Sequence, residues 1–126
     1  MITENELSKI VVDLCIKIHR ALGPGLLESI YEDVLCYELQ KAGLQYSRQQ
    51  EITVSYEGMK MNSAFRADVI VEGKLILELK SVEDIIPVHL KVLLTYLRLT
   101  NIKLGLLINF NEAYVKDGIK RMVNNL

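Results

Sequence analysis

The sequence is poor in the residue types that bind structural metals. It has two cysteines and two histidines among 126 residues. They do not form a set of four at short spacings, as a structural zinc site needs, so we expect none. Cys15 and Cys36 stand among apolar neighbours in segments with helical periodicity. They are expected to be free, buried thiols in a reducing cytoplasm.

The sequence also lacks long hydrophobic runs and an excess of one charge. It has no run of 18 apolar residues and no charged-then-apolar leader, so we expect no membrane span, no secretion signal and a cytoplasmic location. The 15 basic and 16 acidic residues nearly cancel, so nucleic-acid binding would need a local basic patch. With two prolines and half of its residues hydrophobic, the chain is expected to form a single domain over residues 1–126.

The spacing of apolar residues changes between helical and strand-like along the chain. Helical patterns, with Thr3 and Glu6 as a capping box and Gly43 as a C-cap, predict helices at 4–22, 26–42, 88–100 and from 111 or 112 to 123. Strand-like patterns predict strands at 51–58, 61–71, 75–81 and 103–110. This order predicts an α/β fold, in which a three-strand antiparallel meander and a crossover strand form a mixed sheet with helices on both faces.

Charged residues interrupt two of the predicted strands. Glu78 and Lys80 are two positions apart and therefore share a face of their strand. A two-residue turn at 72–73 would put Asp68 on the other face. A three-residue loop at 71–73 instead pairs Asp68 with Ile76 and places it diagonal to Glu78.

We predict the three-residue loop because it separates polar from apolar side chains. It sends one set of residues to the apolar face: Ala67, Val69, Leu75, Leu77 and Leu79. It leaves another set on the polar face: Arg66, Asp68, Glu78 and Lys80. This cluster is either a solvated ion pair, contributing under about 1 kcal/mol, or a site for a hard divalent cation completed by a substrate phosphate.

Asp68, followed on the next strand by Glu78-Leu79-Lys80, resembles the signature of the PD-(D/E)XK nuclease superfamily. Upstream, Gly25, Glu28 and Tyr31 have the GxxExxY spacing. Together with "FRAD", "LELKS" and "LLINF", this resembles the GxxExxY proteins, a branch of that superfamily, across nearly the whole chain. The resemblance implies a restriction-endonuclease-like core. It also implies a nuclease that hydrolyses phosphodiester bonds of DNA rather than RNA with Mg²⁺ or Mn²⁺, and a chain this small favours a homodimer.

The resemblance also assigns roles to individual residues. Asp68, Glu78, the backbone carbonyl of Leu79 and Glu28 would hold the metal. Lys80 would orient the attacking water or stabilise the phosphorane-like transition state. Glu28 is alternatively an ordinary acidic residue in the first turn of a helix.

Further residues are candidates for contact with the substrate or for support of the site. Arg66 could hold a phosphate, and Tyr96 could stack on a base, although a buried tyrosine would look the same in the sequence. Tyr31 lies one turn after Glu28 and is either a supporting hydroxyl or a tyrosine at the core edge. His19 is either part of the site or a helix-end histidine. A basic track for the nucleic-acid backbone could be formed by Lys60, Arg66, Lys80, Lys91 and Arg98.

Two positions depart from the superfamily pattern. Val92 stands where many members have a glutamine four residues before Tyr96, and Ala67 stands in place of the proline. The missing amide puts catalysis in question, and the near-neutral charge favours two other interpretations. One is a catalytically inactive binding or assembly module of the same fold, and the other is an α/β interaction domain with an ion-paired sheet face.

Overall fold

A central mixed sheet lies between helices in the computed structural model, which describes residues 1–61 and 65–126. The helices are α1 (Glu4–Leu22), α2 (Glu28–Lys41), α3 (Pro87–Thr100) and the short 3₁₀ turn η1 (Val115–Gly118). The strands are β1 (Tyr46–Glu51), β2 (Val54–Tyr56), β3 (Met59–Met61), β4 (Arg66–Val71), β5 (Leu75–Lys80), β6 (Leu104–Asn109) and β7 (Ile119–Val123). Within the described residues, every helix is too short or too polar to cross a membrane.

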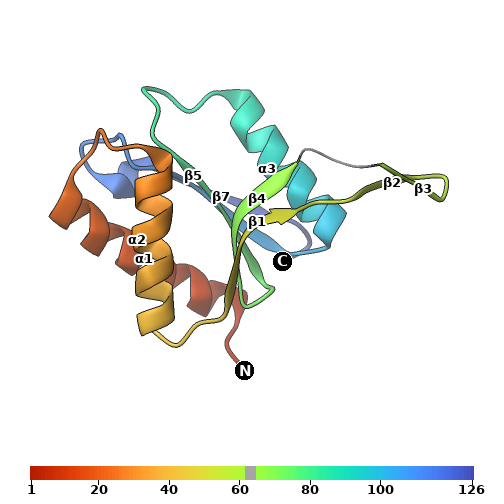
Figure 1. The fold of residues 1–126 in the computed structure, drawn as a ribbon, viewed down its shortest axis with the longest axis horizontal. Coiled ribbons are helices and arrows are strands. Elements are labelled where there is room, and N and C mark those ends of the chain that lie inside the picture. Colours follow the sequence, from red (N-terminus) through yellow and green to blue (C-terminus); the bar gives the residue numbers. More distant parts are fainter. Residues whose placement is uncertain (62–64) are drawn as a thin grey trace.

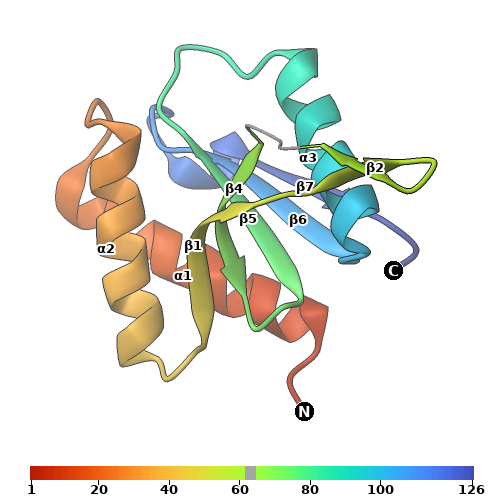
Figure 2. The same cartoon turned by 45° about the vertical axis from the view of Figure 1, so that its right-hand side comes forward.

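The sheet has the order β1-β4-β5-β6-β7. β1, β4 and β5 pair antiparallel, and α3 then crosses over so that β6 lies parallel to β5. The predicted α/β architecture, a three-strand meander plus a crossover strand, is therefore confirmed. α1 and α2 cover one face of the sheet and α3 covers the other (Figures 1 and 2).

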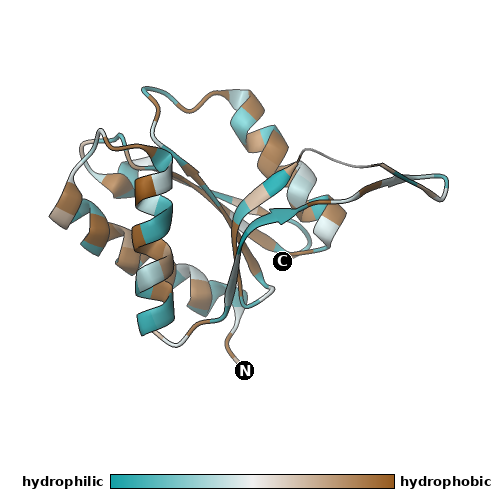
Figure 3. Ribbon diagram, viewed as in Figure 1, coloured by the Kyte–Doolittle hydropathy of each residue, from teal (hydrophilic) through white to brown (hydrophobic). Residues whose placement is uncertain are grey.

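Each face of the sheet has its own hydrophobic core. Val69, Leu77 and Leu79 pack with α1 and α2, whereas Ile70 and Ile76 pack with α3. The side chains of β5 alternate between these layers, as a strand covered on both sides requires. The ribbon of the central strands is accordingly coloured mostly as hydrophobic, whereas hydrophobic and hydrophilic residues alternate along the helices (Figure 3). Cys15 and Cys36 are buried free thiols, as predicted, and burial raises the pKa of Cys15 to about 12.

The ends of the first two helices follow the capping signals. The Thr3 hydroxyl accepts the N–H of Glu6, which completes the predicted capping box of α1. After α2, Gly43 has a φ of 75° and donates to the carbonyl of Gln40, while the N–H of Leu44 donates to the carbonyl of Leu39. This is the Schellman arrangement that a glycine at this position allows.

The first strand of the sheet lies earlier in the chain than predicted. The predicted strand 51–58 is correct only over Val54–Tyr56, which form β2, because the sheet strand β1 ends at Glu51. β2 and β3 form a separate hairpin that extends from the body of the domain (Figure 1). Its turn, Glu57-Gly58, has positive φ at both positions, as in a type I′ turn. Residues 62–64 of the predicted strand 61–71 lie outside the described residues.

The loop of the β4–β5 hairpin has three residues, as predicted, but they are not the three residues that were predicted. Val71 pairs with Leu75 and Ile70 with Ile76, so the loop is 72–74 instead of 71–73. The register is displaced by two positions relative to the predicted pairing of Asp68 with Ile76. A displacement by two retains the in-and-out alternation of the strands.

The C-terminal segment is a strand and not the predicted helix. β7 pairs antiparallel with β6, for example Ile108 with Ile119. Ile119 packs on the α1–α2 core and Met122 on the α3 core. A spacing of three puts side chains on one face of a helix but on opposite faces of a strand. Because the free edge of β6 offers backbone partners, the strand forms here.

Replacing Gly118 by alanine is expected to destabilise the domain by about 1–3 kcal/mol. An added Cβ would lie 2.5 Å from the backbone oxygen of Asn109 and 2.8 Å from the Cγ of Glu112, so backbone would have to move. Denaturant unfolding measures the loss. Lys116→Ala, at an exposed position of the same turn, is the matched control and should change stability by under about 0.5 kcal/mol. Equal stabilities of the two variants would contradict this packing.

Candidate active site

The two central carboxylates meet where β4 and β5 stop pairing. The paired register ends at Val69 and Leu77. Beyond it, the Leu79 N–H donates to Oδ2 of Asp68 at 2.8 Å, and the Asp68 N–H donates to Oε1 of Glu78 at 3.4 Å. Side-chain oxygens thus replace the backbone carbonyls that would continue the ladder. This exchange brings the Asp68 and Glu78 side chains within hydrogen-bonding reach of each other.

The local backbone differs from a regular hairpin in one further respect. Ala67 is fully buried in the α3-side core, not on the α1–α2 side with Val69 as predicted. Asp68 correspondingly turns toward α2 and lines a hollow with Glu28. The carboxylates therefore meet at the end of the paired ladder and not as diagonal neighbours on one face.

Glu78 is buried in an environment that disfavours its charge. Only 7% of the residue is exposed. Burial and, to a smaller extent, the negative charge of Asp68 together raise the pKa of Glu78 to about 9, although the positive charge of Lys80 acts in the opposite direction. Glu78 is therefore protonated at neutral pH unless a cation compensates for both effects.

Lys80 ends β5 in a half-buried position. None of the ion pairs found among residues 1–61 and 65–126 joins it to Asp68 or Glu78. The cluster is thus not the simple solvated ion pair considered from the sequence. The ammonium group remains available to a further anion.

Glu28 is the first residue of α2 and is tied to the chain that follows Lys80. Its Oε2 accepts the N–H of Ser81 at 3.3 Å, and the Ser81 hydroxyl donates to the carbonyl of Leu26 at 2.6 Å. A hollow of about 420 Å³ is lined by Glu28, Ser29, Glu32, Gln49, Asp68 and Leu79. Glu28 and Asp68 therefore face a common space, whereas Glu78 does not line it.

A larger hollow, of about 680 Å³, opens elsewhere on the surface beside β1. Glu72 is the one acidic residue in its lining, and its Oε2 already accepts the N–H of Gln45 at 2.5 Å. It has no lysine or second carboxylate with which to perform chemistry. We therefore place the site by the contact between carboxylates and not by the size of the hollow.

The donor atoms suit a magnesium-like ion. In the described part of the chain, no three Asp, Glu, His or Cys side chains are grouped closely enough to hold a metal by themselves. Mg²⁺, however, needs one or two protein carboxylates, with water and substrate phosphate as the other ligands. Asp68 and Glu78 provide that number of hard oxygen donors. A divalent cation would also offset the burial and repulsion that keep Glu78 protonated.

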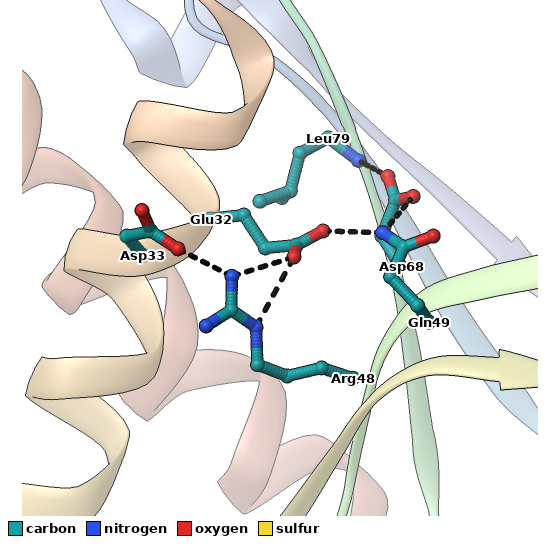
Figure 4. A network of polar contacts seen from close by, with 6 residues as sticks. All are labelled: Glu32, Asp33, Arg48, Gln49, Asp68 and Leu79. Atoms are coloured by element: carbon teal, nitrogen blue, oxygen red, sulfur yellow. Dashed lines mark hydrogen bonds and ion pairs between the residues drawn. The ribbon is translucent and has the colours of Figure 1, made fainter.

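A polar network that the sequence did not predict connects α2 and β1 with Asp68 (Figure 4). Arg48 donates from Nε and Nη2 to Oε2 of Glu32, at 3.1 and 2.8 Å, and from Nη2 to Asp33 at 2.5 Å. The Gln49 amide donates to Oε1 of Glu32 at 2.7 Å and to Oδ1 of Asp68 at 3.2 Å. The two carboxylates beside Arg48 raise the pKa of its guanidinium further.

Asn109, at the end of β6, fixes the segment that leaves the site. It is fully buried; its Nδ2 donates to the carbonyl of Val82, and its Oδ1 accepts the N–H groups of Val82 and Asn111. These contacts hold the chain just beyond Lys80 against the end of β6. The apolar setting of "LLINF" could have marked this asparagine as one that needs buried partners.

Tyr31 lies in the α1–α2 core, just after Glu28 in α2. It is fully buried, and its ring stacks on that of Phe110 with centroids 4.3 Å apart. Its hydroxyl donates to the carbonyl of Gly23 at 2.5 Å and accepts the N–H of Leu26 at 3.2 Å. Tyr31 thus fixes the loop from which α2, and with it Glu28, begins.

Tyr31→Phe is expected to lower the free energy of unfolding by about 1–2 kcal/mol, because both loop groups lose their partner. Thermal or denaturant unfolding measures this loss. Tyr37→Phe is the matched control, because Tyr37 is 61% exposed on the same helix. It should change stability by under about 0.5 kcal/mol. An unchanged Tyr31→Phe variant would show that the hydroxyl does not hold the loop.

Two other candidate residues lie near the carboxylates. Tyr96 is 6% exposed and packs edge-to-face against Phe65. Burial raises the pKa of its hydroxyl, and the charges of Glu78 and Asp68 raise it further. It is therefore a buried tyrosine and not an exposed stacking platform. Arg66 is exposed at the start of β4, and its Nη1 donates to the carbonyl of Gln49 at 3.3 Å.

The remaining candidates lie apart from Asp68. His19 is 8% exposed at the end of α1, contacts the Glu112 carbonyl through Nε2 at 2.9 Å and lines a different hollow. It is a helix-end histidine in this structure. Of the other proposed basic residues, Lys60 lies in β3, and Lys91 and Arg98 are exposed on α3. Val92 packs against the α3-side core.

The mixed sheet, its flanking helices and the carboxylate pair beside Lys80 define a restriction-endonuclease-like domain. A family model of the PD-(D/E)XK nuclease superfamily matches residues 5–122. The chain belongs to this superfamily. Comparisons with curated proteins and with solved structures gave no match.

Proposed function

We propose that this domain is a magnesium-dependent nuclease of the GxxExxY branch that hydrolyses phosphodiester bonds, in DNA rather than RNA. Membership of the PD-(D/E)XK nuclease superfamily supports a nuclease. The observation that carries the proposal is the pair of hydrogen bonds next to Lys80 that joins the adjacent strands, in which the Asp68 N–H donates to Glu78 and the Leu79 N–H donates to Asp68. A structural ion pair would instead join these carboxylates to the lysine.

Asp68, Glu78 and the carbonyl oxygen of Leu79 would hold Mg²⁺ or Mn²⁺, with Glu28 contributing from the other side of the hollow. When bound, such an ion lowers the pKa of water and offsets the charge of a phosphate. The Leu79 N–H and the Gln49 amide orient the Asp68 carboxylate. Asn109 and Ser81 fix the chain beyond Lys80.

Lys80 and Arg66 would act on the nucleic acid itself. Lys80 stands next to Glu78 without an ion-pair partner among the described residues, so its ammonium can stabilise the charge that develops on the phosphate. Arg66 is exposed beside Asp68 and can hold a neighbouring phosphate. A homodimer would let two such small domains enclose a duplex.

The alternative is a catalytically inactive module of the same fold, which Val92 favours because its apolar side chain cannot supply the amide expected there. The two functions are separated by incubating the purified protein with DNA and RNA duplexes and single strands, in Mg²⁺, in Mn²⁺ and in EDTA. Metal-dependent cleavage of DNA that is lost in Lys80→Met supports the nuclease. Binding of nucleic acid without cleavage under every condition identifies the inactive module.

A further inference from the structure

We propose that Gln49 is a positioning residue that fixes the orientation of the Asp68 carboxylate for catalysis. The inference rests on the proposed nuclease function and extends it to a side chain with no recognisable signature in the sequence. Gln49 acts through Asp68 and has no contact of its own with Glu78 or Lys80 among the described residues.

The Gln49 amide lies between two carboxylates, and this fixes its orientation (Figure 4). Nε2 is 2.7 Å from Oε1 of Glu32 and 3.2 Å from Oδ1 of Asp68. Ionised carboxylates only accept hydrogen bonds, so the NH₂ end must face both of them. One amide group thereby donates its two hydrogens to two acidic side chains.

Glu32 gives the amide a fixed support. It is 7% exposed, and its other carboxylate oxygen is held by two donors of Arg48 at 3.1 and 2.8 Å. Arg48 is itself anchored on Asp33 of the same helix. A continuous chain of hydrogen bonds therefore runs from α2 through Gln49 to Asp68.

Asp68 is held at both oxygens by this arrangement. Oδ2 accepts the Leu79 N–H at 2.8 Å, and Oδ1 accepts the Gln49 amide at 3.2 Å. Each carboxylate oxygen has a second lone pair that neither of these two hydrogen bonds uses. With both oxygens restrained, these remaining lone pairs point in fixed directions. Polar groups that orient the ligands of a metal typically change activity by about 10- to 100-fold when they are removed.

The backbone of Gln49 supports a role beyond stability. Its φ is 48°, in the left-handed region that a residue with a Cβ adopts at a cost in free energy. Glycine would adopt this conformation without that cost. Glycine at this position would therefore make the domain more stable if the side chain had no other role. The glutamine amide is needed to contact both Glu32 and Asp68.

The test compares Gln49→Gly and Gln49→Met with Gln50→Met. Methionine has a similar length but cannot donate, glycine also relieves the backbone strain, and Gln50 is the neighbouring exposed residue of β1. We expect kcat to fall by about 10- to 100-fold in both Gln49 variants, with KM within about two-fold of the wild type. Gln49→Gly should unfold at a temperature no lower than the wild type, and Gln50→Met should match the wild type throughout.

A crystal structure of Gln49→Met gives a readout that does not depend on activity. The inference predicts that the Asp68 carboxylate turns away from its wild-type orientation while the backbone of β4 stays in place. An unmoved carboxylate, or an unchanged kcat in both Gln49 variants, would overturn it. If the wild type cleaves no nucleic acid, the proposed nuclease function fails, and the orientation of Asp68 in this crystal structure alone decides the positioning role.

Discussion

Asp68→Asn is expected to lower the turnover of nucleic-acid cleavage by about 10³-fold while the domain stays folded. Both carboxylate oxygens of Asp68 are held in place, Oδ2 by the Leu79 N–H and Oδ1 by the Gln49 amide. Asparagine keeps one oxygen but loses the negative charge that would hold a divalent cation. Loss of about 4 kcal/mol of transition-state stabilisation corresponds to this factor.

The fold should tolerate this substitution. The oxygen of asparagine can accept the Leu79 N–H, and its NH₂ group then faces the Gln49 amide, so only the hydrogen bond between these two side chains is lost. We expect a loss of stability of about 1 kcal/mol. Rates of cleavage at saturating Mg²⁺ provide the measurement, with Asp84→Asn, an exposed carboxylate after β5, as the matched control. Wild-type turnover in Asp68→Asn would remove Asp68 from the reaction.

Glu78→Gln is expected to make the metal-free domain more stable and, at the same time, inactive. The folded protein holds the pKa of Glu78 at about 9, compared with an ordinary value of 4.5. Between these two values, the unfolded chain is ionised while the folded chain keeps the proton. Stability therefore falls by about 1.4 kcal/mol for each unit that the pH rises in this interval. Below about 4.5, both states are protonated and the effect disappears.

Glutamine has the shape of the protonated carboxyl group and removes this titration. The amide oxygen can still accept the Asp68 N–H. At pH 7 the expected gain in stability is about 3 kcal/mol, and it should shrink toward pH 5. Denaturant unfolding in EDTA across this range measures it, with Glu83→Gln, an exposed site, as the control. If the free energies of unfolding of the wild type and Glu78→Gln changed with pH in the same way, the pKa of Glu78 would not be raised in the folded protein.

The elements that the sequence predicted well are those with strong apolar periodicity. α1, α3, β5 and β6 have boundaries close to the predicted ones, because their buried positions recur at a helical spacing or run continuously. β1 was missed for the opposite reason. Its sequence, "YSRQQE", has no apolar alternation, because as an edge strand it is mostly exposed. Only its pairing with β4 makes it a strand.

Some residues of the site could likewise be predicted from the sequence, and others could not. Asp68 and Glu78 could be brought together from the sequence, because two consecutive strands of a hairpin must be neighbours. The register was displaced by two positions, since the turn 72–74 could not be read precisely enough from its residues. The missed element β1 carries Arg48 and Gln49, so their network was not predictable. The position of Glu32 near the site could have been predicted, because Glu32 lies one helical turn after Glu28.

The central claim, that Asp68 and Glu78 form a site for a divalent metal, is tested most directly by calorimetric titration of Mg²⁺ and Mn²⁺. The titration should use the wild type, Asp68→Asn and Glu78→Gln, each alone and with a non-cleavable DNA duplex that supplies the phosphate ligands. The account predicts saturable binding by the wild type that is lost in both variants. Absence of binding by the wild type even with the duplex, or equal binding by all three proteins, would contradict it.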